Sequence, residues 1–278
     1  MTTGIGRWLL GGFFALFVLF LYGPTLTIVV LSFQGPEGGL TFPMRGASLA
    51  WFTRLFQPQA VGDLGAAFAR SLALGAMVMA ATVLISVSAA MAFRQRFRGA
   101  GALFALAVAS LIVPGVLVSL GVGLLFNLME WDASWWNSAF GAQLTWTLPF
   151  GLLIMFAVFN RFDRAWEEAA RDLGASPWGV FRHVVLPIIA PGVVGIALFG
   201  FTLSYDEFAR TMLTAGSTNT LPLEIVGMTT NVTSPVLYAL GTVTTAVSLA
   251  AIVAAMLTMR ALRKRPGRAR RSTWQRSS

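Results

Sequence analysis

Few side chains of this 278-residue sequence could act as nucleophiles, metal ligands or phosphate binders. It has 0 Cys and one histidine, His183, so a thiolate catalyst, a cysteine-ligated metal or a site with two imidazoles cannot be built. The sole lysine, Lys264, follows Arg263 and not glycine, which excludes a G-x4-G-K-[ST] phosphate loop. We therefore predict no catalytic residue, no metal site and no cofactor in this chain, and interpret His183 as a helix-surface residue.

The most patterned polar segment is 161–184. Its first part, Arg164 to Leu173, favours a short helix, because Arg164 and Glu168, like Glu167 and Arg171, are opposite charges four residues apart. Glu168 has two compatible interpretations, pairing with Arg164 and contact with another protein.

A sharp corner is predicted after this helix. Gly174 stands where a left-handed C-cap belongs, and Ser176 with Pro177 supplies an N-cap and first turn for a second helix, 178–185, which Leu186-Pro187 should end. Such a helical hairpin suits insertion into a groove of a soluble partner. We expect four apolar residues to form its contact face: Ala169, Ala170, Leu173 and Phe181.

The elements that must carry this hairpin are apolar. Hydrophobic residues make up 56% of the sequence and charged ones 11%, which is typical of a polytopic membrane protein. Pro24 and Pro114 fall inside apolar blocks, where each should bend a helix, either to line a pathway or only to improve packing. We predict an all-α membrane protein with six transmembrane helices, from the blocks 8–33, 66–93, 100–126, 143–159, 184–203 and 235–259.

The distribution of arginine predicts the orientation. With both termini and the 94–99 and 160–183 loops on one side, 16 basic residues lie there and 4 on the other side, which favours cytoplasmic N- and C-termini. Eight of these 16 basic residues lie between Arg260 and Arg276, and a basic cluster after an apolar segment favours membrane lipid over nucleic acid as its binding partner.

We divide the chain into one permeation domain, 1–265, and a basic tail, 266–278. We expect four tryptophans to anchor the opposite interface: Trp51, Trp131, Trp135 and Trp136.

The segment 161–187 resembles a family motif. Glu168-Ala169-Ala170, Gly174, Val184 in an isoleucine position and Leu186-Pro187 fit E-A-A-x3-G-x9-I-x-L-P, the EAA motif of permease subunits of bacterial ABC importers. The resemblance implies the type I importer fold in the inner membrane. It also implies that Glu168, Ala169, Ala170, Gly174, Leu186 and Pro187 dock an ATPase subunit, which alone hydrolyses ATP.

Further segments resemble the spermidine/putrescine branch of these permeases. They include Leu148-Pro149-Phe150, the run 201–207, Thr220-Leu-Pro-Leu223 and Ser234-Pro235. The resemblance implies a second, unlike permease as partner and a solute handed over by an extracytoplasmic binding protein. One position departs from the branch: Gly115 follows Pro114, where an acidic residue is common.

Acidic residues at the end of the fifth block could serve a cationic solute. Asp206 and Glu207, with the rings of Tyr205 and Phe208, would suit passage of a polyamine, although either acid could instead pair with Arg210. Permeases for another small solute (amino acid, opine, phosphonate or metal chelate) are the alternative. A gradient-driven secondary carrier is disfavoured, because no buried acid and base pair suggests proton coupling.

Overall fold

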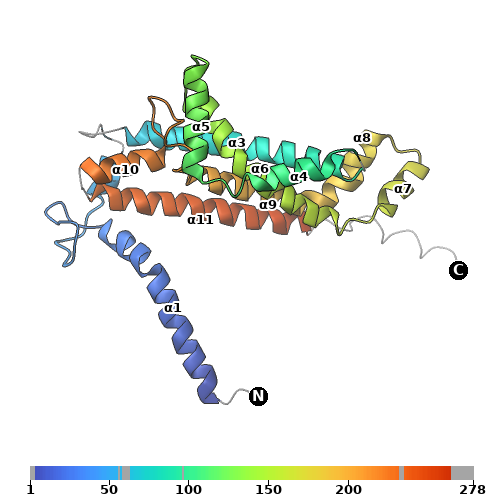
Figure 1. The fold of residues 1–278 in the computed structure, drawn as a ribbon. Coiled ribbons are helices and arrows are strands. Elements are labelled where there is room, and N and C mark those ends of the chain that lie inside the picture. Colours follow the sequence, from blue (N-terminus) through green and yellow to red (C-terminus); the bar gives the residue numbers. More distant parts are fainter. Residues whose placement is uncertain (1–3, 56, 58–62, 96, 232–234, 264–278) are drawn as a thin grey trace. The chain divides into compact units, whose positions relative to one another are not determined.

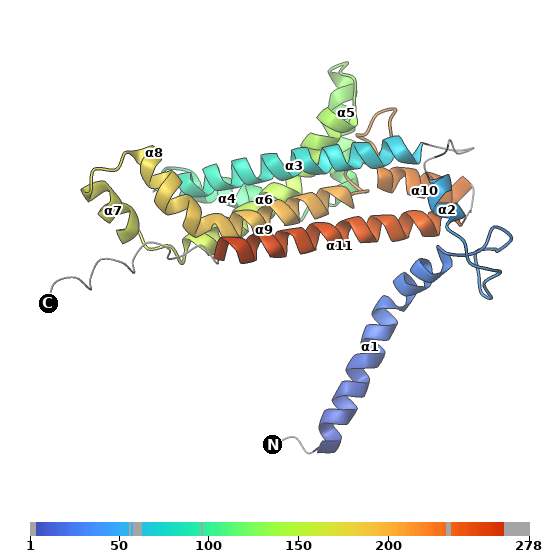
Figure 2. The same cartoon turned by 180° about the vertical axis from the view of Figure 1, so that it is seen from behind.

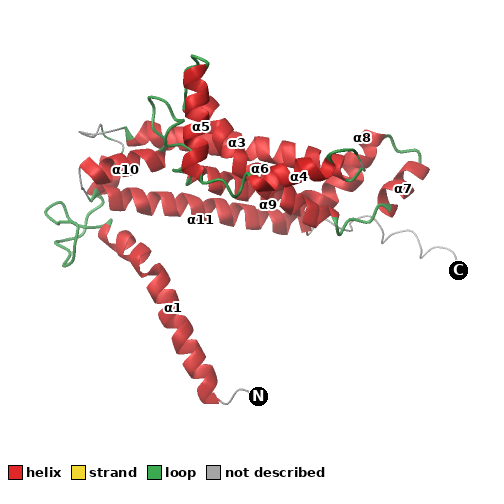
Figure 3. Cartoon of the chain, viewed as in Figure 1, coloured by secondary structure: helices red, strands yellow, loops and turns green. Residues whose placement is uncertain are grey.

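The computed structural model describes residues 4–55, 57, 63–95, 97–231 and 235–263. In this part of the chain the regular elements are helices joined by loops (Figure 3). They are α1 (Gly4–Leu31), α2 (Ala50–Arg54), α3 (Leu64–Phe93), α4 (Ala100–Ala109), α5 (Gly115–Leu128), η1 (Trp135–Ala139), α6 (Phe140–Phe159), α7 (Ala165–Asp172), α8 (Pro177–Val180), η2 (Phe181–Val185), α9 (Leu186–Tyr205), α10 (Leu221–Asn231) and α11 (Val236–Arg263).

The chain divides into two compact units. One comprises residues 1–66 and 224–249, and the other comprises 67–223 together with the segment from 250 onward. The single domain over 1–265 stays a prediction, and the basic tail 266–278 lies outside the described residues.

Five of the helical segments are long and apolar enough to cross a membrane: Gly6–Leu31, Leu64–Phe93, Trp135–Phe159, Pro177–Tyr205 and Val236–Thr258. They correspond to five of the six predicted blocks. The third block, 100–126, instead forms α4 and α5, of 10 and 14 residues. At ~1.5 Å per residue neither helix alone crosses a ~30 Å hydrocarbon core. The count of six spans and the side of the termini remain predictions.

Pro114 breaks the third block and does not merely bend it. It has extended backbone angles (φ −55°, ψ 132°) at the N-cap of α5, and it follows a turn at residues 110–113. Ser110 at the end of α4 donates through Oγ to the carbonyl oxygen of Thr145 on α6 at 2.6 Å. The break is therefore tied to the neighbouring helix, and α5 runs across the direction of α4 and α6 (Figure 1). Pro24, in contrast, lies inside the continuous helix α1.

The fourth span gains its missing length from the N-terminal flank. Its helix begins at Trp135 as a single π-helical turn and continues to Phe159, which gives 25 residues instead of the 17 of the apolar block. Asn137 shapes its start, because its Oδ1 accepts from the backbone N–H of Ser134 at 2.8 Å. Residues 139–141, which precede the apolar block, are thus part of the span.

The core of the larger unit is built where α6 and α9 pack, with α3 beside them (Figure 2). Small residues permit close approach, since a Cβ on Gly151 of α6 would overlap the Ser86 hydroxyl of α3. The buried cluster at one end joins these helices to η2 and α8. It contains Ala90, Met155, Phe159, Val180, Val185, Ile189 and Ile196.

In the smaller unit the segment after α1 folds around Gln34, whose side chain is fully buried. Its Oε1 accepts from the Arg45 N–H at 3.0 Å, and its backbone carbonyl accepts from Trp51 Nε1 at 2.8 Å. Trp51 is 5% exposed, so the prediction that it anchors the membrane interface is wrong. A buried indole satisfies its one donor inside the protein, which here fixes the 34–51 segment.

Candidate functional site

The predicted helical hairpin exists. Its first helix, α7, ends at Asp172, and Gly174 takes the left-handed conformation with φ +81°. The Ser176 hydroxyl accepts from the Gly179 N–H at 3.1 Å and caps α8, with Pro177 in the first turn. The two helices lie at one end of the larger unit (Figure 1). The glycine corner and the serine cap are therefore confirmed.

Leu186-Pro187 does not end the second helix. α8, η2 and α9 form one continuous helical segment, Pro177–Tyr205, of 29 residues. The Leu186 N–H donates to the carbonyl of Phe181, five residues back, so a π-helical turn precedes the proline. This wider turn accommodates a residue that lacks an N–H and crowds the preceding turn. The predicted helix 178–185 and the predicted fifth span are therefore one continuous helical segment.

Two of the four residues predicted to form the apolar contact face pack inward instead. Leu173 is 89% exposed, but Ala170 and Phe181 pack against the buried cluster at the base of the hairpin. We define the exposed side of the hairpin as the exposed hairpin face, formed by Trp166, Glu168, Ala169, Leu173 and Trp178. Gly174, Leu186 and Pro187 are also exposed, so of the six predicted docking residues only Ala170 turns partly inward.

The acidic residue that fastens the hairpin is Glu167 and not Glu168. Glu167 is 7% exposed and lies 2.6 Å from Arg94 Nη1 and 3.4 Å from Arg171 Nη2. The predicted pair of Arg164 with Glu168 does not form, because the Arg164 guanidinium donates to the carbonyl oxygen of Arg94. Sequence spacing indicated the Glu167–Arg171 pair, but nothing local indicated Arg94, which is 73 residues away.

The four residues proposed for a solute pathway, 205–208, do not share one surface. Tyr205 is 2% exposed and stacks on Phe201 with ring centroids 5.8 Å apart. Glu207 is buried, Phe208 is half-buried and Asp206 is exposed. Of the two acids, only Asp206 offers a carboxylate to a solute at the surface of this chain.

Glu207 forms the ion pair with Arg210 that the sequence left open, and since both side chains are buried the expectation of no buried acid and base pair is wrong. Its Oε2 lies 3.7 Å from Arg210 Nη1, and its Oε1 accepts from the Arg210 backbone N–H at 2.7 Å. The guanidinium also lies over the Trp146 ring, 4.6 Å from its centroid. Arg210 Nε and Trp146 Nε1 are both buried donors with no acceptor in the described part of the chain.

Hydrogen bonds between buried polar side chains link helices inside the larger unit. The sequence pattern did not predict them. Gln143 on α6 donates through Nε2 to the Thr211 hydroxyl at 2.9 Å and accepts from the Ser204 hydroxyl at 2.5 Å. Thr82 on α3 donates to the Thr147 hydroxyl at 2.9 Å. Isolated Ser and Thr residues in apolar helices give no periodic signal, so only the packing reveals these contacts.

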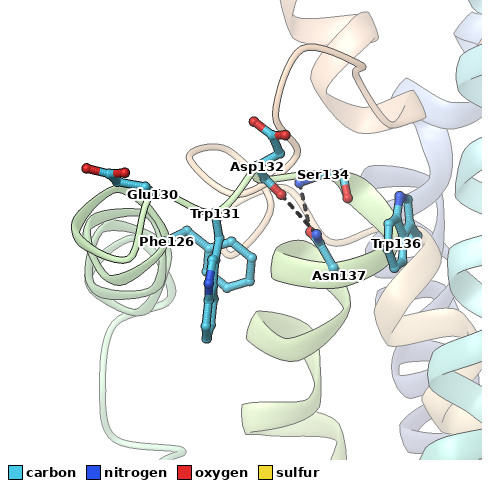
Figure 4. A pocket seen from close by; sticks show the side chains of 7 residues that line it. All are labelled: Phe126, Glu130, Trp131, Asp132, Ser134, Trp136 and Asn137. Atoms are coloured by element: carbon cyan, nitrogen blue, oxygen red, sulfur yellow. Dashed lines mark hydrogen bonds between the residues drawn. The ribbon is translucent and has the colours of Figure 1, made fainter.

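A pocket lies at the other end of the span Trp135–Phe159 from the hairpin. Its volume is about 570 Å³, and the residues that line it are Phe126, Glu130, Trp131, Asp132, Ser134, Trp136 and Asn137 (Figure 4). Asn137 Nδ2 donates to the Asp132 carbonyl at 2.9 Å, and the Trp131 ring meets Phe126 edge-on at 5.5 Å. The Glu130 carboxylate points away from the other lining residues (Figure 4), so the groups that suit an organic cation are Asp132 and the exposed indoles. We call it the 126–137 pocket.

A family model matches residues 82–268: the binding-protein-dependent transport system inner membrane component. The chain belongs to this family. The matched region contains the hairpin, the 126–137 pocket and Arg210. This chain is therefore a multi-pass inner-membrane permease subunit of an ABC importer.

Curated relatives match nearly the whole chain. The spermidine/putrescine transport system permease protein PotC of Escherichia coli K12 is 30% identical over 258 residues, which cover 92% of this chain and 96% of the relative. The putrescine transport system permease protein PotI of the same organism is 29% identical over 255 residues, 88% of this chain and 89% of PotI.

Solved structures support the fold. A chain of a bacterial ABC transporter involved in the import of alginate has a TM-score of 0.66 at 14% identity, covering 94% of this chain and 96% of that one. A chain of the MetNI methionine ABC transporter has a TM-score of 0.55 at 16% identity, covering 69% of this chain and 93% of that one.

Proposed function

We propose that this permease subunit passes a polyamine, such as spermidine or putrescine, or a related organic cation. An extracytoplasmic binding protein delivers the solute, a second and unlike permease completes the channel, and a separate ATPase subunit docks on the hairpin and hydrolyses ATP. The role of this chain is to convert movement of the hairpin into alternating access.

The observation that carries the proposal is the similarity to PotC, 30% identity over 92% of this chain, which runs through the hairpin and the solute-facing segments alike. Similarity confined to the hairpin would support only an ATPase partner. Similarity over 92% of the chain also includes the membrane segments that would contact the solute, so it supports a similar solute as well.

The chemistry of the 126–137 pocket supports a cationic solute. Asp132 provides negative charge, and Trp131 and Trp136 present exposed ring faces to which an ammonium group is attracted. Because the pocket and the hairpin lie at opposite ends of one span, a hairpin in the cytoplasm places the pocket where a solute is delivered. Asp206 supplies a further exposed carboxylate.

A second solute class is favoured by Arg210. Among the described residues, neither its Nε nor the neighbouring Trp146 Nε1 finds an acceptor. Both atoms are buried, so a solute that carries a carboxylate beside its amine would supply an acceptor only in a conformation that opens this site. An amino acid or an opine belongs to this class. The two classes differ in charge, so they can be separated experimentally.

The experiment is uptake of labelled spermidine or putrescine into vesicles that contain the whole complex with ATP inside. Excess unlabelled diamine should compete, and excess amino acid should not. Vesicles with the ATPase-inactive complex are the control. Absence of polyamine uptake by the wild-type complex would refute the substrate proposal, and competition by an amino acid alone would favour the second class.

A further inference from the structure

The hairpin meets the membrane helices at Arg94. This residue directly follows α3, and its backbone N–H donates to the carbonyl of Ala90 at 3.2 Å, so it continues the last turn of that helix. Its Nη1 lies 2.6 Å from Oε1 of Glu167 on α7. The two side chains are only 13% and 9% exposed. A charge-assisted hydrogen bond with so little access to water is strong and is weakly screened by salt.

Two aromatic rings complete the surroundings of Arg94. Its Cζ lies 4.9 Å from the ring centroid of Phe159, the last residue of α6, and 4.9 Å from that of Phe162 in the following loop. A guanidinium over a ring face is attracted by the ring quadrupole, and arginine favours this geometry more than lysine does. Arg94 thus contacts the ends of α3 and α6 as well as α7.

The hairpin is held at the same point by a second polar contact. The Arg164 guanidinium donates to the backbone carbonyl oxygen of Arg94, one turn before Glu167. Ala170, one turn after Glu167, packs against the buried cluster that includes Ala90 and Phe159. One side of α7 therefore packs against the helix ends, while Glu168 and Leu173 on the exposed hairpin face stay accessible.

We infer that Arg94 and Glu167 are positioning residues that make α7 and the ends of α3 and α6 move as one body. The inference rests on the proposed function, in which an ATPase subunit displaces the hairpin. The second helix of the hairpin continues into α9, but α7 is joined to α6 and to α8 only by short non-helical segments, which alone would let α7 tilt without the membrane helices. The buried ion pair removes that freedom, because separating its charges would leave each one desolvated and unpaired.

A purely local role is the competing explanation: the pair could fold the hairpin and carry no movement. The two roles differ in what a new link between positions 94 and 167 does. If the segments move together, a covalent bridge preserves transport. If they slide past each other during the cycle, the same bridge stops it.

The chain has 0 Cys, so Arg94→Cys/Glu167→Cys introduces two unique thiols. The complex, with other subunits free of accessible cysteine, is reconstituted and treated with a short bis-maleimide. The readout is solute taken up per ATP hydrolysed. Without the reagent we expect a loss of about fivefold or more in this ratio, and with it we expect recovery. A bridged complex without transport, or an unbridged variant with the wild-type ratio, would overturn the inference.

Neutral variants provide a test that does not depend on cross-linking. Arg94→Gln and Glu167→Gln should each lower the ratio, and the double variant should be less impaired than the sum of both, because no unpaired buried charge remains. Strict additivity would contradict the inference. Arg171→Gln is the matched control, since this second partner of Glu167 is 59% exposed and should change the ratio less than about twofold.

Failure of the substrate proposal can be told apart from failure of this inference. If the wild-type complex transports no polyamine, stimulation of its ATPase by the purified binding protein, used as isolated, replaces uptake as the readout. The same loss in the variants and the same recovery on bridging are then expected.

Discussion

Gly115 lies against the guanidinium of Arg210: a Cβ on Gly115 would stand 3.0 Å from Arg210 Nη1 and 3.1 Å from the Cβ of Ala209. The start of α5, just after the break at Pro114, therefore meets the arginine that pairs with Glu207. An acidic residue in place of Gly115 would place a carboxylate beside this guanidinium. With glycine at position 115, the Arg210 guanidinium has Glu207 and the Trp146 ring as its side-chain partners.

The first prediction concerns this contact. Both Gly115→Asp and Gly115→Leu place a Cβ in this close contact. Gly115→Asp should cost less, because its carboxylate meets a buried cation, whereas Gly115→Leu should destabilise the subunit by about 1–3 kcal/mol through overpacking. The melting temperature of the purified complex checks both variants. Equal losses for aspartate and leucine would contradict the proximity of Arg210.

The second prediction concerns the hairpin corner. Gly174 has φ +81°, and a Cβ added to it would meet no atom of the described chain within 4 Å, so only the backbone conformation limits substitution there. Gly174→Val should cost about 1–3 kcal/mol locally and reduce both ATPase co-purification and uptake, with the chain still inserted in the membrane.

Gly174→Asn is the control for that variant, since asparagine adopts the left-handed region more readily. It should retain most of the recovered ATPase. Normal ATPase recovery with valine would refute the docking role of the corner.

The third prediction separates the two acids after α9. Glu207→Gln removes the partner of a buried cation and should lower the amount of assembled complex, at a cost on the order of 3 kcal/mol that Arg210→Gln partly reverses. Asp206→Asn should leave assembly intact and lower polyamine uptake only. The measurements are complex yield and initial uptake rate. The reverse pattern would refute the roles given to both acids.

The fourth prediction concerns the 126–137 pocket. Trp131→Leu removes an exposed ring face worth about 0.5–1 kcal/mol to a bound cation, so the apparent KM for polyamine should rise about two- to fivefold with little change in the maximal rate. Asp132→Asn should add to this effect.

Trp8→Leu on α1 is the control for an exposed tryptophan outside the pocket, since Trp8 is 85% exposed. It should leave the KM unchanged. A KM for Trp131→Leu equal to that of the control would exclude the pocket from the route of the solute.

Patterns in the amino-acid sequence were enough to predict the class of protein, five of the spanning segments and the shape of the hairpin. These features depend on local interactions: apolar runs of sufficient length, the glycine at a left-handed corner, and Ser176-Pro177 at a helix start. Each acts over a few residues, so the order of residue types is sufficient to predict it.

Tertiary packing determines which of the adjacent acids Glu167 and Glu168 forms the buried ion pair with Arg94. It also determines which of Asp206 and Glu207 pairs with Arg210. Both choices depend on partners or packing that sequence spacing does not encode, such as Arg94 at the end of α3. The same holds for the break of the third block at Pro114, which Ser110 fixes by bonding to α6. In an apolar chain a buried polar group takes the partner that folding brings within reach, and that partner can lie anywhere in the sequence.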